Sequence, residues 1–327
     1  MKSVMKHMFS QVPRADIPRS SFNRSCGLKT TFDSGELIPV LCDEALPGDT
    51  FNLDMTAFTR LSTPLHPFMD NIFLDSFFFS VPIRLIWDNF QKFNGEQTDP
   101  GDSTDYVVPT MQAPAAGYIN ESLSDYFGIP TGVPNLEHNS LFHRAYNLIY
   151  NEWFRDQNLI DSVVVDRDDG PDASTDYTIL RRGKRHDYFT SCLPWPQKGD
   201  SVDLPLGTTA PVDRVSNATG WRTYQSGTDT LQPTGTLNTN STGYVVDAGG
   251  DPLSFDPIDG LVADLSTATA ATVNELRQAF QLQRLFERDA RGGTRYIEII
   301  KSHFGVTSPD LRATRPEYLG GGSSRIN

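Results

Sequence analysis

Part of the chain's N-terminal third alternates apolar and polar residues in the manner of a β-strand. The clearest case is the stretch from Asp49 to Ser62. Between positions 51 and 57 every second residue is apolar: Phe51, Leu53, Met55 and Ala57. Because successive side chains of a strand point to opposite faces, these four residues would share one face and polar residues the other. The pattern predicts a strand with one face in water.

The next segment, NIFLDSFFFSVP at residues 71–82, is apolar on both faces of an extended chain and contains three consecutive phenylalanines. Such a dense apolar run has to be buried. We expect one face to meet the core and the other to meet a packed helix or a neighbouring copy of the chain. After Pro82 the apolar residues follow helical spacing, so the strand is predicted to run into a short helix.

Three later segments carry apolar residues at helical spacing. In residues 139–159, one stripe of the predicted helix is apolar and is expected to face the core: Phe142, Ala145, Ile149 and Trp153. The other stripe is polar: Arg144, Asn147, Asn151 and Arg155. A second helix is predicted to begin at Thr272, where Glu275 completes a capping box, and to run to Gly292. A third is predicted within residues 294–306.

Residues 199–266 differ from the rest of the chain because Thr, Gly, Ser, Asn and Asp dominate them. Their few aromatic residues include Trp221, Tyr224 and Tyr244. A segment of this length without a core stripe is rare inside a compact domain, so we interpret it as a surface insertion with a function or a small subfold of its own. The segment RPEYLGGGSSRIN, at 315–327, ends in a glycine run where we expect neither strand nor helix.

The charge is distributed unevenly along the chain, whose formal net charge is −13. Residues 1–30 carry a net charge of +5, which leaves −18 on the remainder. The six cations of this arm are Lys2, Lys6, Arg14, Arg19, Arg24 and Lys29. The arm is either a solvated terminus or a segment that meets nucleic-acid phosphates or an acidic neighbour.

Composition excludes several classes of protein. The 327 residues include 25 Gly and 22 Pro and are 38% hydrophobic, which favours a folded, loop-rich chain over a disordered or all-helical one. No run of about 18 apolar residues and no secretory signal pattern occurs. The three cysteines, Cys26, Cys42 and Cys192, form no C-x-x-C motif, so we expect neither a disulfide framework nor a zinc cluster, and reduced thiols in a cytosol.

Two clusters are candidates for chemical sites. The acidic stretch from Asp166 to Asp176 suggests calcium, but its glycine stands fifth rather than sixth and no glutamate occupies the twelfth position, so an acidic surface turn is favoured. His186 and Cys192 are six residues apart, a spacing that does not establish a catalytic pair. We expect no catalytic residues, no resident metal and no cofactor.

A basic run precedes two aromatic residues in the stretch 181–189. Its cations are Arg181, Arg182, Lys184 and Arg185, and Tyr188 and Phe189 follow. Cations beside stacking rings are typical of single-stranded nucleic-acid binding. The alternative, given equal weight, is a charged turn paired with acids of the same chain or of a neighbouring copy.

Long idiosyncratic segments resemble one known family. They are FDSGELIPVLCDEALPGDTFNLDMTAFTRL, MDNIFLDSFFFSVPIRLIWDNFQKFNGEQ, RAYNLIYNEWFRDQNL, LRRGKRHDYFTSCLPWPQKG and LERDARGGTRYIEIIKSHFGVTSPDLRATRPEYLGGGS. Together they resemble the major capsid protein of the Microviridae, in its gokushovirus branch, over nearly the whole chain.

The resemblance implies a mainly β fold, a single jelly-roll β-barrel of viral capsid type with helical and long loop insertions, incomplete in this chain. It implies a non-enzymatic protein, sixty copies of which form an icosahedral T=1 shell around circular single-stranded DNA. Its partners would be the genome, other virion proteins and a host surface receptor. The protein would be assembled in the cytoplasm of a bacterial host and reside in the virion.

The expected organisation has four parts. Residues 1–30 form the basic arm, 31–198 the first barrel strands with helical insertions, 199–266 a protrusion near the threefold axes, and 267–327 a helical segment returning to the barrel. In the protrusion, the three aromatic residues would pack against copies of themselves. The alternatives are an intracellular carbohydrate-binding jelly roll and a metal-dependent enzyme. The enzyme is not favoured, because it would need clustered histidines and carboxylates and the six histidines are scattered.

Overall fold

The computed structural model describes two units of the chain. It covers residues 16, 18–102, 105–185, 187–189, 191–203, 272–307 and 314–326, with short stretches at 212–214, 223–225, 231–232, 238–239, 241–242, 245–246, 253–255 and 261–263. The first unit comprises residues 1–185 and 314–327, and the second comprises 186–313. Three of the arm cations, Lys2, Lys6 and Arg14, lie outside the described residues.

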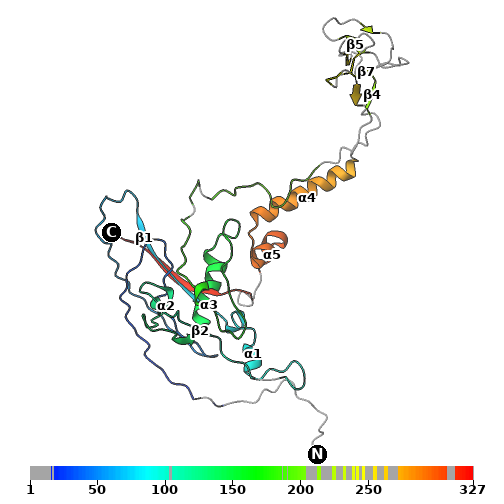
Figure 1. The fold of residues 1–327 in the computed structure, drawn as a ribbon. Helices are drawn as coiled ribbons and strands as arrows, with labels where there is room; N and C mark the ends of the chain where they lie inside the picture. Colours follow the sequence, from blue (N-terminus) through cyan, green and yellow to red (C-terminus); the bar gives the residue numbers. More distant parts are fainter. Residues whose placement is uncertain are drawn as a thin grey trace, which may run out of the picture. The chain divides into compact units, whose positions relative to one another are not determined.

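The first unit combines short helical segments, one longer helix and two pairs of strands among its described residues (Figure 1). Its elements are β1 (Ile72–Ser80), η1 (Ile83–Leu85), α1 (Phe90–Phe93), β2 (Thr110–Gln112), α2 (Leu123–Tyr126), β3 (Glu137–Asn139), α3 (Leu141–Ile149), η2 (Tyr150–Phe154), η3 (Ser174–Asp176) and β11 (Glu317–Ile326). The predicted strand with its three phenylalanines is confirmed, and the one short helix expected after it is found as two short segments, η1 and α1.

The glycine run near residue 321 forms a strand, so the expectation of irregular structure there is wrong. β11 pairs antiparallel with β1, and Gly321 and Gly320 lie opposite Phe77 and Phe78 (Figure 1). A Cβ atom on Gly321 would collide with the carbonyl oxygen of Ser76. Glycine, which usually weakens a strand, is therefore required here by the close approach of the two backbones.

The phenylalanines of β1 contact rings from two other elements. Phe77 lies 5.2 Å from Phe154 between ring centroids, and Phe79 lies 5.5 Å from Trp153 and 5.6 Å from Tyr318. Trp153 and Phe154 belong to η2, a π-helical turn that continues α3. Part of the phenylalanine run is therefore packed against a helical segment of the same chain, as predicted.

Helix α3 buries the stripe that its sequence marks as polar. Arg144 and Asn147 are fully buried, whereas Phe142 and Ile149 are only partly covered. The prediction that the apolar stripe faces the core is wrong for this helix. The donor groups of these two side chains have partners: the Asn147 amide nitrogen donates to the carbonyls of Val164 and Asp176, at 2.8 and 3.1 Å.

Arg144 is the centre of a buried ion pair. Its Nε donates to the Asp172 carboxylate at 2.7 Å, and its Nη2 contacts the second oxygen of that carboxylate. Its Nη1 donates to the carbonyl oxygens of Ile86, at 3.0 Å, and Asp168, at 2.8 Å. The Tyr177 hydroxyl also donates to Asp172, at 2.7 Å. This pair connects α3, the chain after η1 and the loop at 168–172.

The acidic stretch 166–176 lies largely at the surface, as predicted, but Asp172 is buried and the stretch also has a structural role. Besides Asp172, Asp169 accepts hydrogen bonds from the Trp87 indole at 2.6 Å and from the Asn89 amide at 3.1 Å. These carboxylates join separate segments of the chain. The structural role of Asp169 and Asp172 was not predicted, because the spacing of acids along a sequence does not reveal their donors.

A small apolar cluster lies beside the ion pair. It is built from Met111, Ala113, Tyr118, Leu123 and Tyr177. The fully buried His143 adjoins it, with its Nε2 3.0 Å from the Ser124 hydroxyl and its ring 4.7 Å from that of Phe127. Burial, and then the neighbouring His138, lower the pKa of His143 to about 3. His143 is therefore neutral at neutral pH.

The stretch from Asp49 to Ser62 forms no strand, in contrast to its alternating pattern. Its apolar residues Phe51, Leu53 and Met55 are exposed. A strand needs a neighbour that supplies backbone hydrogen bonds, and no described residue pairs with this stretch. Alternation alone therefore predicted the wrong structure here.

The second unit contains two helices and seven short strands among its described residues. The strands are β4 (Val212–Arg214), β5 (Thr223–Gln225), β6 (Leu231–Gln232), β7 (Asn238–Thr239), β8 (Val245–Val246), β9 (Leu253–Phe255) and β10 (Leu261–Ala263). The helices are α4 (Val273–Arg291) and α5 (Tyr296–Phe304). The helical spacing of the sequence predicts both, and the capping box of Thr272 and Glu275 is present.

The described strands pair only in small sheets. Those of the second unit form the order β6-β5-β9 and the pairs β10-β4 and β7-β8, and β1 has β11 as its one partner strand among the described residues. A barrel needs every strand to be paired on both edges. The part of the chain that the structure describes contains no closed barrel.

Replacing Gly321 with Ala should destabilise the first unit. The new methyl group would collide with the β1 backbone, and overpacking of this kind costs about 1–3 kcal/mol. The matched control is Gly320→Ala, whose Cβ would have no atom within 4 Å. Urea unfolding followed by tryptophan fluorescence should show a lower midpoint for Gly321→Ala alone; equal midpoints would contradict the pairing.

Acid should destabilise the first unit through His143. The unfolded chain binds a proton at this histidine below about pH 6.5, whereas the folded chain does not until about pH 3, so stability is lost as the pH falls through this window. His143→Gln should flatten the fall in melting temperature between these values. The exposed His66→Gln is the control and should keep the original slope. If both variants keep it, His143 is not the group responsible.

Candidate nucleic-acid interface and assembly surface

The described part of the basic arm contacts the loop at 43–48. The Arg24 guanidinium makes two hydrogen bonds to the Asp43 carboxylate, at 2.7 and 3.1 Å, and that of Arg19 donates to the carbonyl oxygen of Gly48. Arg24 nevertheless keeps most of its side chain in solvent. Two of the predicted arm cations therefore have partners in the chain itself and remain accessible.

The basic run 181–185 is joined to residues 35–37 by backbone hydrogen bonds. The amide of Leu37 donates to the carbonyl of Leu180 at 2.9 Å, and the amide of Arg182 donates to that of Gly35 at 2.7 Å. The side chain of Arg181 lies 3.5 Å from the Glu36 carboxylate and stays largely exposed. These bonds hold the run along a neighbouring segment.

Two arginines of the run converge on Asp75, a largely buried acid in the middle of β1. Both Arg182 and Arg185 contact its carboxylate, one guanidinium on each oxygen. Burial raises the pKa of Asp75, but hydrogen bonds from Ser323 and from both arginines outweigh it, so the pKa lies below its usual value. Asp75 is therefore charged at neutral pH and neutralised within the chain.

The same arginines stack on the phenylalanines that flank Asp75. Arg182 lies 4.9 Å from the centroid of Phe77, and Arg185 lies 4.1 Å from that of Phe73. Residues 73, 75 and 77 share one face of the strand, so each guanidinium meets one ring and the common carboxylate. Of the two interpretations of the basic run, the charged turn paired with acids of the same chain therefore applies to Arg182 and Arg185.

The remaining residues of the predicted interface are more open. Tyr188 and Phe189, in the second unit, are 86% and 85% exposed, and their rings lie 5.5 Å apart with an edge-on geometry. Lys184, in the first unit, has interactions of its own within the structure. The role of these residues and of Arg181 in nucleic-acid binding stays a prediction.

Sequence reasoning missed Asp75 as the organiser of this region. The signal was present, because an acid between apolar residues in LDSFFF cannot be buried without a cationic partner. The partner could not be identified from sequence, since Arg182 follows it by 107 positions. The pairing depends on the fold.

The residues predicted to make contacts in the protrusion fall largely outside the described part. Trp221 and Tyr244 are not described. Tyr224 lies in β5, opposite Leu231 of β6 and Ser254 of β9. The insertion therefore contains small antiparallel sheets, in line with the expected subfold.

An extended segment of the first unit exposes large apolar side chains. Phe58, Leu65 and Met69 are 94%, 99% and 96% exposed. Scattered apolar residues are ordinary on protein surfaces, but so many along one segment are typical of a surface that meets another chain. This segment, residues 51–69, is the candidate assembly surface.

The described residues show neither a metal-binding cluster nor a membrane-spanning helix. No group of three or more His, Cys, Asp or Glu side chains there could hold a metal ion. None of the helices in the same ranges has the length and apolar character to cross a bilayer. Cys192 is exposed, and His186 lies outside the described part.

Comparison with known proteins shows similarity to phage capsid proteins. The family model described as capsid protein (F protein) matches residues 10–327. The chain is 53% identical to capsid protein VP1 of Bdellovibrio phage phiMH2K, over 97% of this chain and 61% of that protein. It is 39% identical to capsid protein VP1 of Chlamydia phage 1, over 100% of this chain and 66% of that protein.

A third relative is capsid protein VP1 of Spiroplasma virus 4, which is 37% identical over 98% of this chain and 62% of that protein. The chain thus spans between 61% and 66% of the length of these three relatives. The resemblance identified from the sequence is confirmed. The chain belongs to the F-protein family of Microviridae phage capsid proteins.

Proposed function

We propose that this chain is part of a major capsid protein, which assembles in sixty copies into an icosahedral shell around circular single-stranded DNA. The observation that carries the proposal is the family match over residues 10–327, together with 53% identity to a phage capsid protein. The protein would have a structural rather than a catalytic role. It would reside in the virion after assembly in the cytoplasm of a bacterial host.

A jelly-roll barrel is the fold that we propose for the complete protein. The antiparallel pair β1–β11 supports it, because jelly rolls are built from antiparallel strands. One edge of β1 is without a partner strand among the described residues and could pair with further strands. The exposed apolar segment at 51–69 supports assembly, since burying these side chains between copies would remove them from water.

The genome would be held by the basic arm and by residues of the run at 181–189. The arm is a +5 segment ahead of a body of −18, and cations of this kind release counterions when they meet nucleic-acid phosphates. In the first unit Arg181 offers an accessible charge. In the second unit Tyr188 and Phe189 offer exposed rings on which bases could stack. These would be the contacts that face the interior.

The insertion at 199–266 would form the surface protrusion that contacts a host receptor. Its polar, turn-rich composition suits an exposed element, and its small sheets give it a structure of its own. Trp221, Tyr224 and Tyr244 would pack against copies of themselves near a threefold axis.

Deleting residues 1–30 should weaken the salt dependence of binding to single-stranded DNA. Each phosphate contact contributes about 0.7 to the slope of log K against log salt, so loss of six cations should flatten it by about 4. The measurement is fluorescence anisotropy of a labelled oligo(dT). A chain that keeps the arm but carries Gln at the six positions is the control and should behave like the deletion. An unchanged slope would mean that the arm contacts acidic protein surfaces instead.

Replacing residues 199–266 with a short Gly/Ser bridge should separate assembly from attachment. In phage particles built from the complete protein, we expect shells to form and adsorption to host cells to fall strongly, because a polar surface element carries the receptor contacts but not the shell contacts. Electron microscopy measures the first and a plating assay of unadsorbed phage the second. Absence of particles would make the insertion a structural clamp, and normal adsorption would refute the attachment role.

A further inference from the structure

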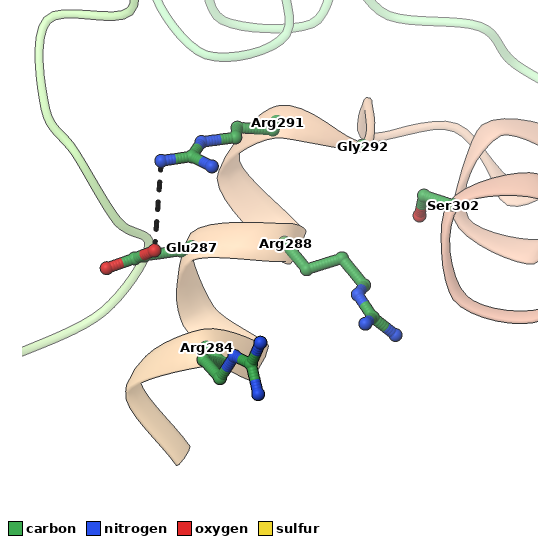
Figure 2. Close-up of a pocket in the computed structure, with 6 residues that line it drawn as sticks. All are labelled: Arg284, Glu287, Arg288, Arg291, Gly292 and Ser302. Carbon is green, nitrogen blue, oxygen red and sulfur yellow. Dashed lines mark ion pairs between the residues drawn. The ribbon is translucent and has the colours of Figure 1, made fainter. Parts of the chain in front are cut away.

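A hollow at the junction of α4 and α5 has three arginines among its six lining residues (Figure 2). Its volume is about 340 Å³, at the low end of the range for small-ligand sites and more than a single small ion needs. All of it belongs to the second unit. The lining residues are Arg284, Glu287, Arg288, Arg291, Gly292 and Ser302.

The arginines come together because of their spacing on the helix. Positions 284, 288 and 291 differ by four and three residues, so at about 100° per residue they lie within about 60° of one another on one face of α4. With a rise of about 1.5 Å per residue they span about 10 Å along the helix axis. Arg277 continues the same face toward the start of the helix.

The charge of the hollow is not balanced by the residues that line it. Arg291 pairs with Glu287 at 3.7 Å, and this is the ion pair drawn in Figure 2. Arg284 and Arg288 make no ion pair with any residue in the described part of the chain. The lining thus contains three cations and one anion, in a chain whose net charge is −13.

A purely structural explanation accounts for only part of this cluster. Arg288 and Arg291 lie in the last turn of α4, where cations interact favourably with the helix dipole. Arg284 lies about two turns from the end, beyond the range of this effect. Arg291 is balanced by Glu287, but the like charges of Arg284 and Arg288, four residues apart, disfavour a helix. An anion bound beside these two guanidinium groups would therefore stabilise this part of α4.

Helix α5 forms the opposite wall of the hollow. A Cβ atom on Gly292 would collide with the Ser302 side chain, so glycine permits the close approach of α5. His303 and Asp289 join the helices through a 2.6 Å contact. The hydroxyl of Ser302 donates to the Ile299 carbonyl at 3.0 Å and can accept or exchange a hydrogen bond at the hollow.

We propose that this hollow binds the phosphate groups of single-stranded nucleic acid. Guanidinium groups match phosphate oxygens well. Arg284 and Arg288 are one helical turn apart, make no ion pair among the described residues and so can donate to the oxygens of one phosphate or of two neighbouring ones. The inference rests on the proposed function only in taking nucleic acid as the partner. It adds a site in the second unit to those proposed for the arm and the 181–189 run.

The test compares two variants of the whole chain that lose the same charge. Arg284→Gln/Arg288→Gln removes the unpaired arginines of the hollow, and Lys198→Gln/Lys301→Gln removes two cations of the same unit that do not line it. Binding of labelled oligo(dT) is measured against salt by fluorescence anisotropy. Circular dichroism verifies that both variants keep their helices.

The arginine variant should bind at least about tenfold more weakly at low salt, since hydrogen bonds to charged groups are worth this much. Its salt slope should fall by about 1.4, that is, about 0.7 for each of two lost contacts. The lysine variant should match the unmodified chain. Equal losses in both variants, or none in either, would overturn the site while leaving nucleic-acid binding by the chain intact.

Two further measurements separate other occupants of the hollow. If inorganic phosphate raises the melting temperature of the unmodified chain but not of the arginine variant, and oligo(dT) binding is equal in the two, the hollow is an ion site and the proposal is wrong. If the variant changes only the self-association seen by sedimentation, the occupant is an acidic segment of a second copy, which also overturns the proposal. Absence of any oligo(dT) binding by the unmodified chain would refute both this site and the proposed genome contacts.

Discussion

The buried ion pair between Arg144 and Asp172 determines the arrangement of the first unit. Both side chains are completely removed from solvent, and the cost of moving two charges out of water is offset only when every donor and acceptor finds a partner. Here the partners are backbone carbonyls after η1 and in the 168–172 loop, and the hydroxyl of Tyr177. Leaving either charge without its partner costs about 3–5 kcal/mol. The pair therefore holds α3, the chain after η1 and the 168–172 loop in one geometry.

The same rule operates at Asp75 of β1. There the carboxylate of an acid within an apolar strand pairs with Arg182 and Arg185. Both belong to the basic run 181–185, whose sequence is typical of nucleic-acid binding. These two guanidinium groups stabilise β1. Arg284 and Arg288 on α4 differ from these two arginines, because they make no ion pair with any described residue.

Exposed apolar residues and family membership support the same conclusion about assembly. Burying the side chains of Phe58, Leu65 and Met69 would lower the free energy of the protein, but the described residues leave them almost wholly exposed to water. In a capsid protein, contacts between copies can provide that cover. Neighbouring copies of the chain would then explain why residues 51–69 are apolar and yet exposed in the single chain.

The sequence by itself determined the local elements and the family. The capping box at Thr272, the helical spacing of α4 and α5 and the apolar run of β1 all act over a few residues, and long idiosyncratic segments identified the capsid proteins. Tertiary structure alone decided that the polar stripe of α3 is buried, that residues 49–62 form no strand and that glycines of β11 pair with β1. These outcomes depend on partners far away in sequence. Arg144 needs an acid 28 residues away, and the β1 backbone needs a strand 246 residues away whose glycine leaves no side chain in the contact.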